Sequence, residues 1–122
     1  MSDDDVTAFR DGGISYLQIP AEDPAEAAAF YAAVFGWRVH GGSDRPGFED
    51  RSGLVIGHFM RDSQVAGEAG VRPYISVESV GDTVEKLTAL GGEVVTAPYP
   101  EGSLTVATFR DPAGNVIGIW QR

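Results

Sequence analysis

The chain has 122 residues, which is enough for one domain with a buried core. Its formal net charge of −9 argues against a nucleic-acid-binding protein and against a protein of anionic membrane surfaces, because both need an excess of Lys and Arg. It contains no cysteine, which excludes disulfides and thiolate metal sites.

The N-terminal residues are acidic and polar, so we expect residues 1–12 to form a flexible tail and not a signal peptide. No apolar run approaches the roughly 18 residues that a membrane-spanning helix needs. These features are typical of a cytoplasmic protein.

A strand and a well-capped helix are expected next. Residues 13–20 predict the strand. Asp23, Pro24 and Glu26 form the pattern of an N-cap, a first-turn proline and a capping-box glutamate, and Gly36 is expected to end the helix. Three further strands are expected over residues 37–40, 48–50 and 54–60.

The second half repeats this order after a polar, glycine-containing linker at residues 61–70. A strand is expected at residues 71–77, and a helix from Ser79 to the glycine pair at residues 91–92. Residues 99–103 are expected to form a loop. The remaining strands are expected over residues 93–97, 104–110 and 115–121.

An internal repeat supports this division. FEDRSGLVIGHF, residues 48–59, aligns without a gap with FRDPAGNVIGIW, residues 109–120. The identical pairs are Phe48/Phe109, Asp50/Asp111, Gly53/Gly114, Val55/Val116, Ile56/Ile117 and Gly57/Gly118. The sequence therefore predicts an α+β fold of two tandem βαβββ modules, residues 13–60 and 71–122, in one compact domain.

Alternation along the strands predicts a polar and aromatic face in each module, opposite an apolar face that carries the helix. The alternation places Gly57 and Phe59 on the polar and aromatic face, and it places the equivalent Gly118 and Trp120 on that face of the second module. It points His58 to the opposite face. The side chains predicted to bind a ligand are Tyr16, Gln18, Phe59, Arg72, Tyr74, Ser76 and Trp120. The alternative is that these aromatic side chains only fill a closed core.

The chain resembles the vicinal oxygen chelate superfamily, which includes glyoxalases, bleomycin resistance proteins and extradiol dioxygenases. The helix sequence FYAAVFGW, the helix end ALGG and the closing FRDPAGNVIGIWQ carry the resemblance, which extends over about residues 13–121 and is strongest to short proteins related to lactoylglutathione lyase. It implies that the eight strands form a cup-shaped mixed sheet with the helices on its outer face. It also implies a homodimer.

The superfamily's metalloenzymes bind a divalent ion through the first and last strands of each module. The resemblance places these positions at Tyr16, Arg72, Gly57 and Gly118. Glycine offers no ligand and arginine cannot be deprotonated, so we expect no metal and no other cofactor. His58 could replace a missing ligand only if a one-residue bulge turned it inward.

The sequence thus favours a metal-free protein that binds a small, partly aromatic organic molecule in the cup. One alternative is an enzyme of the superfamily that is metal-free or has atypical ligands, with Tyr16 or Tyr74 as acid or base. A second alternative is a dimeric protein with a vestigial pocket. Metal-dependent glyoxalase or dioxygenase activity is not expected, and neither nucleic acid nor a membrane is an expected partner.

Overall fold

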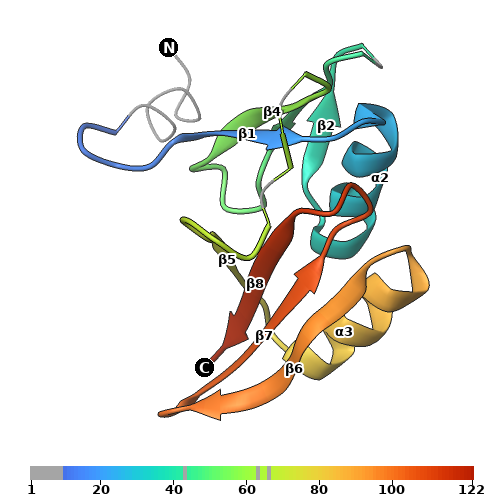
Figure 1. The fold of residues 1–122 in the computed structure, drawn as a ribbon. Coiled ribbons are helices and arrows are strands. Elements are labelled where there is room, and N and C mark those ends of the chain that lie inside the picture. The colour runs from blue at the N-terminus through green and yellow to red at the C-terminus, as the bar shows by residue number, and fades with distance from the viewer. Residues whose placement is uncertain (1–9, 43, 63, 66) are drawn as a thin grey trace. The chain divides into compact units, whose positions relative to one another are not determined.

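A computed structural model describes residues 10–42, 44–62, 64–65 and 67–122. Most of the predicted tail at residues 1–12 therefore lies outside the described residues. The chain divides into two compact units between Gln64 and Val65, and each unit contains one sheet and one helix (Figure 1). No helix in the described ranges has the length and the apolar composition that crossing a membrane requires.

The first unit has the predicted βαβββ order. Its elements are β1 (Tyr16–Pro20), α2 (Pro24–Phe35), β2 (Arg38–His40), β3 (Gly47–Glu49) and β4 (Ile56–Met60). The strand order in the sheet is β1-β4-β3-β2, with β1 parallel to β4 and the other pairs antiparallel. A parallel pair needs a crossover connection, and α2 lies within it.

Helix α2 begins and ends where the sequence predicts. Asp23 is the N-cap, and its Oδ1 accepts a hydrogen bond from the Glu26 backbone N–H at 3.1 Å. Gly36 adopts a left-handed φ of 72°, which a residue with a side chain rarely takes, and its N–H donates to the Ala32 carbonyl at 3.0 Å.

An aromatic cluster joins α2 to the sheet and forms the core of the first unit. The Tyr31 ring, fully buried, stacks on Trp37 with centroids 4.7 Å apart. Trp37 in turn stacks on Phe48 at 4.8 Å, and Phe59 contacts both Tyr31 and Phe48. Burial of these rings is the main apolar stabilisation of the unit.

The second unit repeats the order in a sheet with strand order β5-β8-β7-β6. Its elements are β5 (Tyr74–Ser76), α3 (Val80–Ala89), β6 (Glu93–Glu101), β7 (Leu104–Arg110) and β8 (Val116–Gln121). The α+β fold of two βαβββ modules is confirmed, and the strands form two four-stranded mixed sheets, one in each unit.

Helix α3 has the predicted N-cap and buries a narrow face. The Ser79 Oγ accepts a hydrogen bond from the Asp82 N–H at 3.1 Å. The Val80 N–H donates to the Gln121 Oε1 of β8, which ties the helix start to the sheet. Val80 and Leu87 are fully buried, so they supply the apolar contact between helix and sheet.

The predicted loop at residues 99–103 was wrong. Strand β6 continues to Glu101, and the turn to β7 contains only Gly102 and Ser103. The β6–β7 register shifts on both sides of Thr96, which hides the regular alternation of a strand. Prolines are tolerated because β6 is an edge strand, where no neighbour needs their missing N–H.

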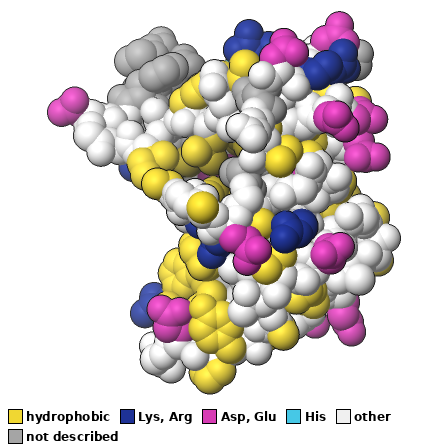
Figure 2. Space-filling view, in the orientation of Figure 1, with side chains coloured by type: hydrophobic (Ala, Val, Ile, Leu, Met, Phe, Trp, Pro, Cys, Tyr) yellow, Lys and Arg dark blue, Asp and Glu magenta, His cyan; other side chains and the backbone are white. Residues whose placement is uncertain are grey.

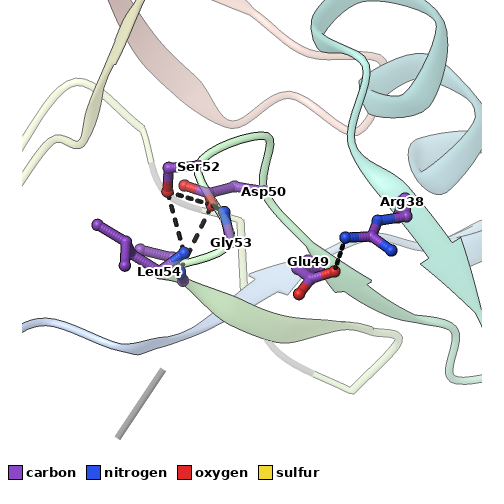
Figure 3. Close-up of polar contacts among 7 residues, drawn as sticks. Arg38, Glu49, Asp50, Ser52, Gly53 and Leu54 are labelled. Atoms are coloured by element: carbon purple, nitrogen blue, oxygen red, sulfur yellow. Dashed lines mark hydrogen bonds and ion pairs between the residues drawn. The ribbon is translucent and has the colours of Figure 1, made fainter. Parts of the chain in front are cut away.

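The repeated segments fold into the same kind of turn, which an aspartate organises in each unit. The Asp111 Oδ1 accepts backbone N–H groups from residues 113, 114 and 115 at 2.9–3.0 Å, and its Oδ2 accepts from the Asn115 side chain. The Asp50 Oδ1 accepts from the Ser52 hydroxyl at 2.7 Å and the Gly53 N–H at 3.1 Å (Figure 3). The repeated aspartates therefore have a structural role, because each carboxylate accepts hydrogen bonds from backbone N–H groups of its turn.

Candidate functional site

The face of the first sheet that α2 does not cover carries polar side chains in two rows. Residues paired across neighbouring strands point to the same face of a sheet. One row contains Arg38, Glu49, Ile56 and Tyr16, and the next contains His40, Gly47, His58 and Gln18. We call these two rows the helix-free face. It is exposed at Tyr16, Gln18 and His40 and half-buried at His58.

A tyrosine–histidine pair lies in the middle of the helix-free face. The Tyr16 Oη and the His58 Nδ1 are 2.8 Å apart, a hydrogen-bond distance, and the two ring centroids are 5.9 Å apart. Partial burial lowers the pKa of His58 below its ordinary value, and the nearby Arg45 and His40 lower the pKa further by repelling a second positive charge. The imidazole is therefore held in its neutral form at neutral pH.

The structure reverses the predicted facing of β4. His58 was expected on the face opposite Tyr16, but the two side chains are hydrogen-bonded on one face. Phe59 was expected on the ligand-binding face, but its ring is fully buried and lies 5.6 Å from Tyr31 of α2. Phe59 is therefore part of the aromatic core.

A register difference of one residue explains this error. The prediction treated Gly57 and Gly118 as equivalent residues on the same kind of face. In the structure Leu17 pairs with Gly57, whereas Tyr74 pairs with Gly118. Leu17 precedes the N-cap of α2, Asp23, by six residues, whereas Tyr74 precedes the N-cap of α3, Ser79, by five. A slip of one residue exchanges the two faces of a strand, so the equivalent glycines face differently.

The second sheet brings together three of the predicted ligand-binding residues. Tyr74 pairs with Gly118 and Ser76 pairs with Trp120, so all four lie on one face, which we call the tyrosine face. The Tyr74 ring lies directly over Gly118, where any Cβ would overlap the ring. Tyr74 is 43% exposed, and exposed hydrophobic side chains are visible on the surface of the second unit in Figure 2.

Arg72 lies just before β5 and is anchored locally. Its Nη2 donates to the Glu68 carbonyl oxygen at 2.7 Å. Its Nε is buried and has no hydrogen-bond partner among the residues that the structure describes. A buried N–H without an acceptor is costly, so this group would gain from an acceptor supplied by a ligand.

The residues at the superfamily's metal positions do not fit a divalent ion. A Cβ at Gly57 would overlap the Leu17 carbonyl oxygen, and one at Gly118 would overlap the Tyr74 ring, so neither position can carry a donor side chain. Arg72 offers only N–H donors. Within the described ranges, no three His, Asp or Glu side chains are grouped as metal ligands. His58 faces the positive charge of Arg45, which opposes a cation there.

Sequence reasoning missed the position of His40. The sequence pattern assigned this residue to no site, and its side chain is exposed at the end of β2. The pairing of β2, β3 and β4, however, places His40 and His58 on either side of Gly47 in one row. The glycine is a signal in hindsight, since its lack of a side chain lets the His40 ring lie over it.

Residues 16–119 match the family model described as a glyoxalase-like domain. The chain belongs to the glyoxalase-like domain family. Among solved structures, the fold of this glyoxalase-like chain is similar to that of a glyoxalase/bleomycin resistance protein/dioxygenase family enzyme from Burkholderia phytofirmans. The TM-score is 0.75 at 23% identity, over 88% of this chain and 96% of that one.

Two curated relatives extend the family match. The protein CFP32 of Mycobacterium bovis is 27% identical over 126 residues, which cover 93% of this chain and 47% of that protein. The anthracycline biosynthesis protein DnrV of Streptomyces peucetius is 24% identical over 137 residues, which cover 96% of this chain and 50% of that protein. The chain thus spans about half the length of these two relatives.

Proposed function

We propose that this glyoxalase-like protein binds a small, partly aromatic organic molecule and does so without the superfamily's divalent metal. One observation carries the proposal: the exposed Tyr74 ring lies over Gly118, beside Ser76 and Trp120. The glycine that removes a metal ligand also makes room for an aromatic platform. Such a platform suits stacking, and the Ser76 hydroxyl suits a hydrogen bond that orients the ligand.

Further groups support a ligand that is polar at one end. The buried Arg72 Nε lacks an acceptor in the described part of the chain and would donate to a ligand oxygen. The relative from Streptomyces peucetius is named for anthracycline biosynthesis, which favours a flat aromatic class of ligand.

Binding of an uncharged probe tests the aromatic platform. We expect 2-naphthol to bind in isothermal titration calorimetry, and we expect Trp120→Ala and Tyr74→Ala each to weaken the affinity by about tenfold, since stacking and burial of one ring are lost. Leu90→Ala, which removes another exposed apolar side chain from the end of α3, is the matched control and should bind normally. Equal affinity in all four proteins would contradict the proposal.

Elemental analysis tests the metal-free part. Protein purified without chelator should contain no stoichiometric zinc, nickel, manganese or iron, because Gly57, Gly118 and Arg72 cannot supply ligands. One equivalent of any of these metals, retained after dialysis, would overturn this part of the proposal. A functional dimer is also proposed, in line with the superfamily, and light scattering would distinguish it from a 12.9 kDa monomer.

A second candidate function, an acid–base enzyme, is favoured by the 2.8 Å contact between Tyr16 and His58. A neutral imidazole beside a phenol can accept a proton from a substrate in the same position. Turnover of a bound ligand that disappears in His58→Gln, with ligand affinity retained, would support this function. Loss of binding together with turnover would instead assign His58 to ligand recognition.

A further inference from the structure

In the row His40–Gly47–His58 on the helix-free face, a glycine lies between two histidines. Gly47 has no side chain, and the His40 ring lies over it, so that a Cβ there would be only 2.6 Å from the His40 Cε1. The His40 ring therefore reaches across β3 toward His58, which pairs with Gly47 from the other side. Both rings can present N–H donors to one small ligand beside this row.

Arg45 adds a fixed positive charge beside this row. It lies two residues before Gly47, and the neighbouring Pro46 carbonyl accepts the Phe59 N–H at 3.1 Å, which ties this segment to β4 next to His58. In the described part of the chain, no carboxylate lies within ion-pair distance of Arg45. A guanidinium with five donors and no partner suits an oxyanion.

The carboxylates nearest in sequence and on the same face are already engaged. Glu49, in the other row, pairs with Arg38 at 2.9 Å (Figure 3). Asp44, next to Arg45, lies 3.9 Å from Arg61. Among the described residues, Arg45 is therefore a positive charge without a carboxylate partner, on a chain whose net charge is −9. Such a local reversal of sign favours an anion at this place over the rest of the surface.

The tyrosine–histidine pair fixes which nitrogen of His58 faces the ligand. When Tyr16 donates its hydroxyl hydrogen to Nδ1, the remaining proton of the neutral ring lies on Nε2. Nε2 can then donate to an anion. If His58 takes up a proton, Nδ1–H donates to the Tyr16 oxygen instead, and Nε2 still donates to the anion.

We propose that Arg45, His40 and His58 form a binding site for an oxyanion, a carboxylate or a phosphate group, on the helix-free face of the first sheet. Arg45 supplies the charge, the two histidines supply N–H donors, and Tyr16 positions His58. The site lies within the first unit, so it does not depend on the aromatic platform of the second unit.

Proton uptake distinguishes this site from general ionic screening. An anion stabilises the protonated form of His58, so affinity for sulfate, which keeps its charge between pH 6 and 8, should rise as the pH falls. The probes are sodium sulfate, sodium phosphate and sodium acetate, each compared with sodium chloride at equal ionic strength. The readout is the pKa of His58 from the imidazole signals in NMR. A tetrahedral oxyanion predicts a shift with sulfate and phosphate only, and a carboxylate site predicts one with acetate.

Matched arginine variants give the decisive comparison. Arg45→Gln should weaken oxyanion binding about three- to tenfold, because a charge-assisted contact is lost at a partly exposed site. It should also raise the pKa of His58 in the absence of any oxyanion, while the rest of the NMR spectrum remains that of the folded protein. Arg61→Gln removes an equal charge that is paired with Asp44 and should leave both quantities nearly unchanged. A His58 pKa that is the same in chloride and in every oxyanion, or equal effects of the two variants, would overturn the proposal.

Discussion

At the scale of single residues, two glycines that align in sequence have different tasks. Gly118 makes room for the ring of Tyr74 on an exposed face, whereas Gly57 lies beneath Phe48 in the core. Neither position tolerates a Cβ, so the absence of a side chain is required by packing at both. The two glycines therefore differ in the ring that each accommodates, Tyr74 at Gly118 and Phe48 at Gly57.

Gly118→Ala should lower the free energy of unfolding by about 1–3 kcal/mol, the usual cost of overpacking, because Tyr74 must move. It should also weaken the binding of 2-naphthol. Gly81→Ala is the control, since nothing lies within 4 Å of its Cβ, and this substitution inside α3 should be neutral or stabilise the protein by about 0.5–1 kcal/mol. Chemical denaturation measures both. Equal stability of the two variants would show that Tyr74 does not lie over Gly118.

His58 predicts an acid dependence of stability. Its folded pKa is lowered, so the unfolded chain takes up the proton first as the pH falls through about 6.5. The stability contributed by the neutral ring is therefore present above that pH and is lost as the pH falls through the folded pKa. His58→Gln should remove this part of the decline in unfolding free energy, and Arg45→Gln should reduce it. A decline that is identical in His58→Gln would contradict the assignment.

At the scale of elements, the turns before β4 and β8 stabilise the two sheets to different extents. Asp111 is 3% exposed and its carboxylate satisfies three backbone N–H groups, while Asp50 is only half-buried. Burial makes an unpaired N–H more costly, because water cannot replace the lost acceptor.

We expect Asp111→Ala to lower the free energy of unfolding by about 2–4 kcal/mol, since several buried N–H groups lose their acceptor. Asp50→Ala should cost less, about 1–2 kcal/mol, because water reaches that turn. Urea denaturation of both variants measures the difference. A smaller loss at Asp111 than at Asp50 would contradict the argument from burial.

The elements also show what the sequence could predict. The helix starts at Asp23 and Ser79 were predicted because a few adjacent residues determine them. Strand β6 was cut short because its bulges and prolines remove the local alternation. The faces of β4 were exchanged because register depends on pairing between distant segments, which local pattern does not reveal.

At the scale of the whole molecule, the excess of 18 acidic over 9 basic residues makes self-repulsion the main long-range electrostatic effect. The three ion pairs seen among the described residues are partly exposed, and such pairs contribute little.

Raising sodium chloride from about 10 to about 150 mM should therefore raise the melting temperature, because the Debye length falls from about 30 to about 8 Å and screens repulsion more than it weakens exposed pairs. Differential scanning calorimetry at pH 7.5 measures this. A melting temperature that falls with salt would show that attractive pairs outweigh the repulsion.

The connection from the strand residue that pairs with the repeated glycine, Gly57 or Gly118, to the N-cap of the following helix is one residue longer in the first unit than in the second. In evolutionary terms, a single insertion or deletion in that connection is enough to give two descendants of one duplicated module different surfaces. One offers imidazoles and the other an aromatic ring, while the turns and caps that fold each module are retained. Duplicated modules should therefore first be compared by their strand pairing, and not by sequence alignment, when their functions are assigned.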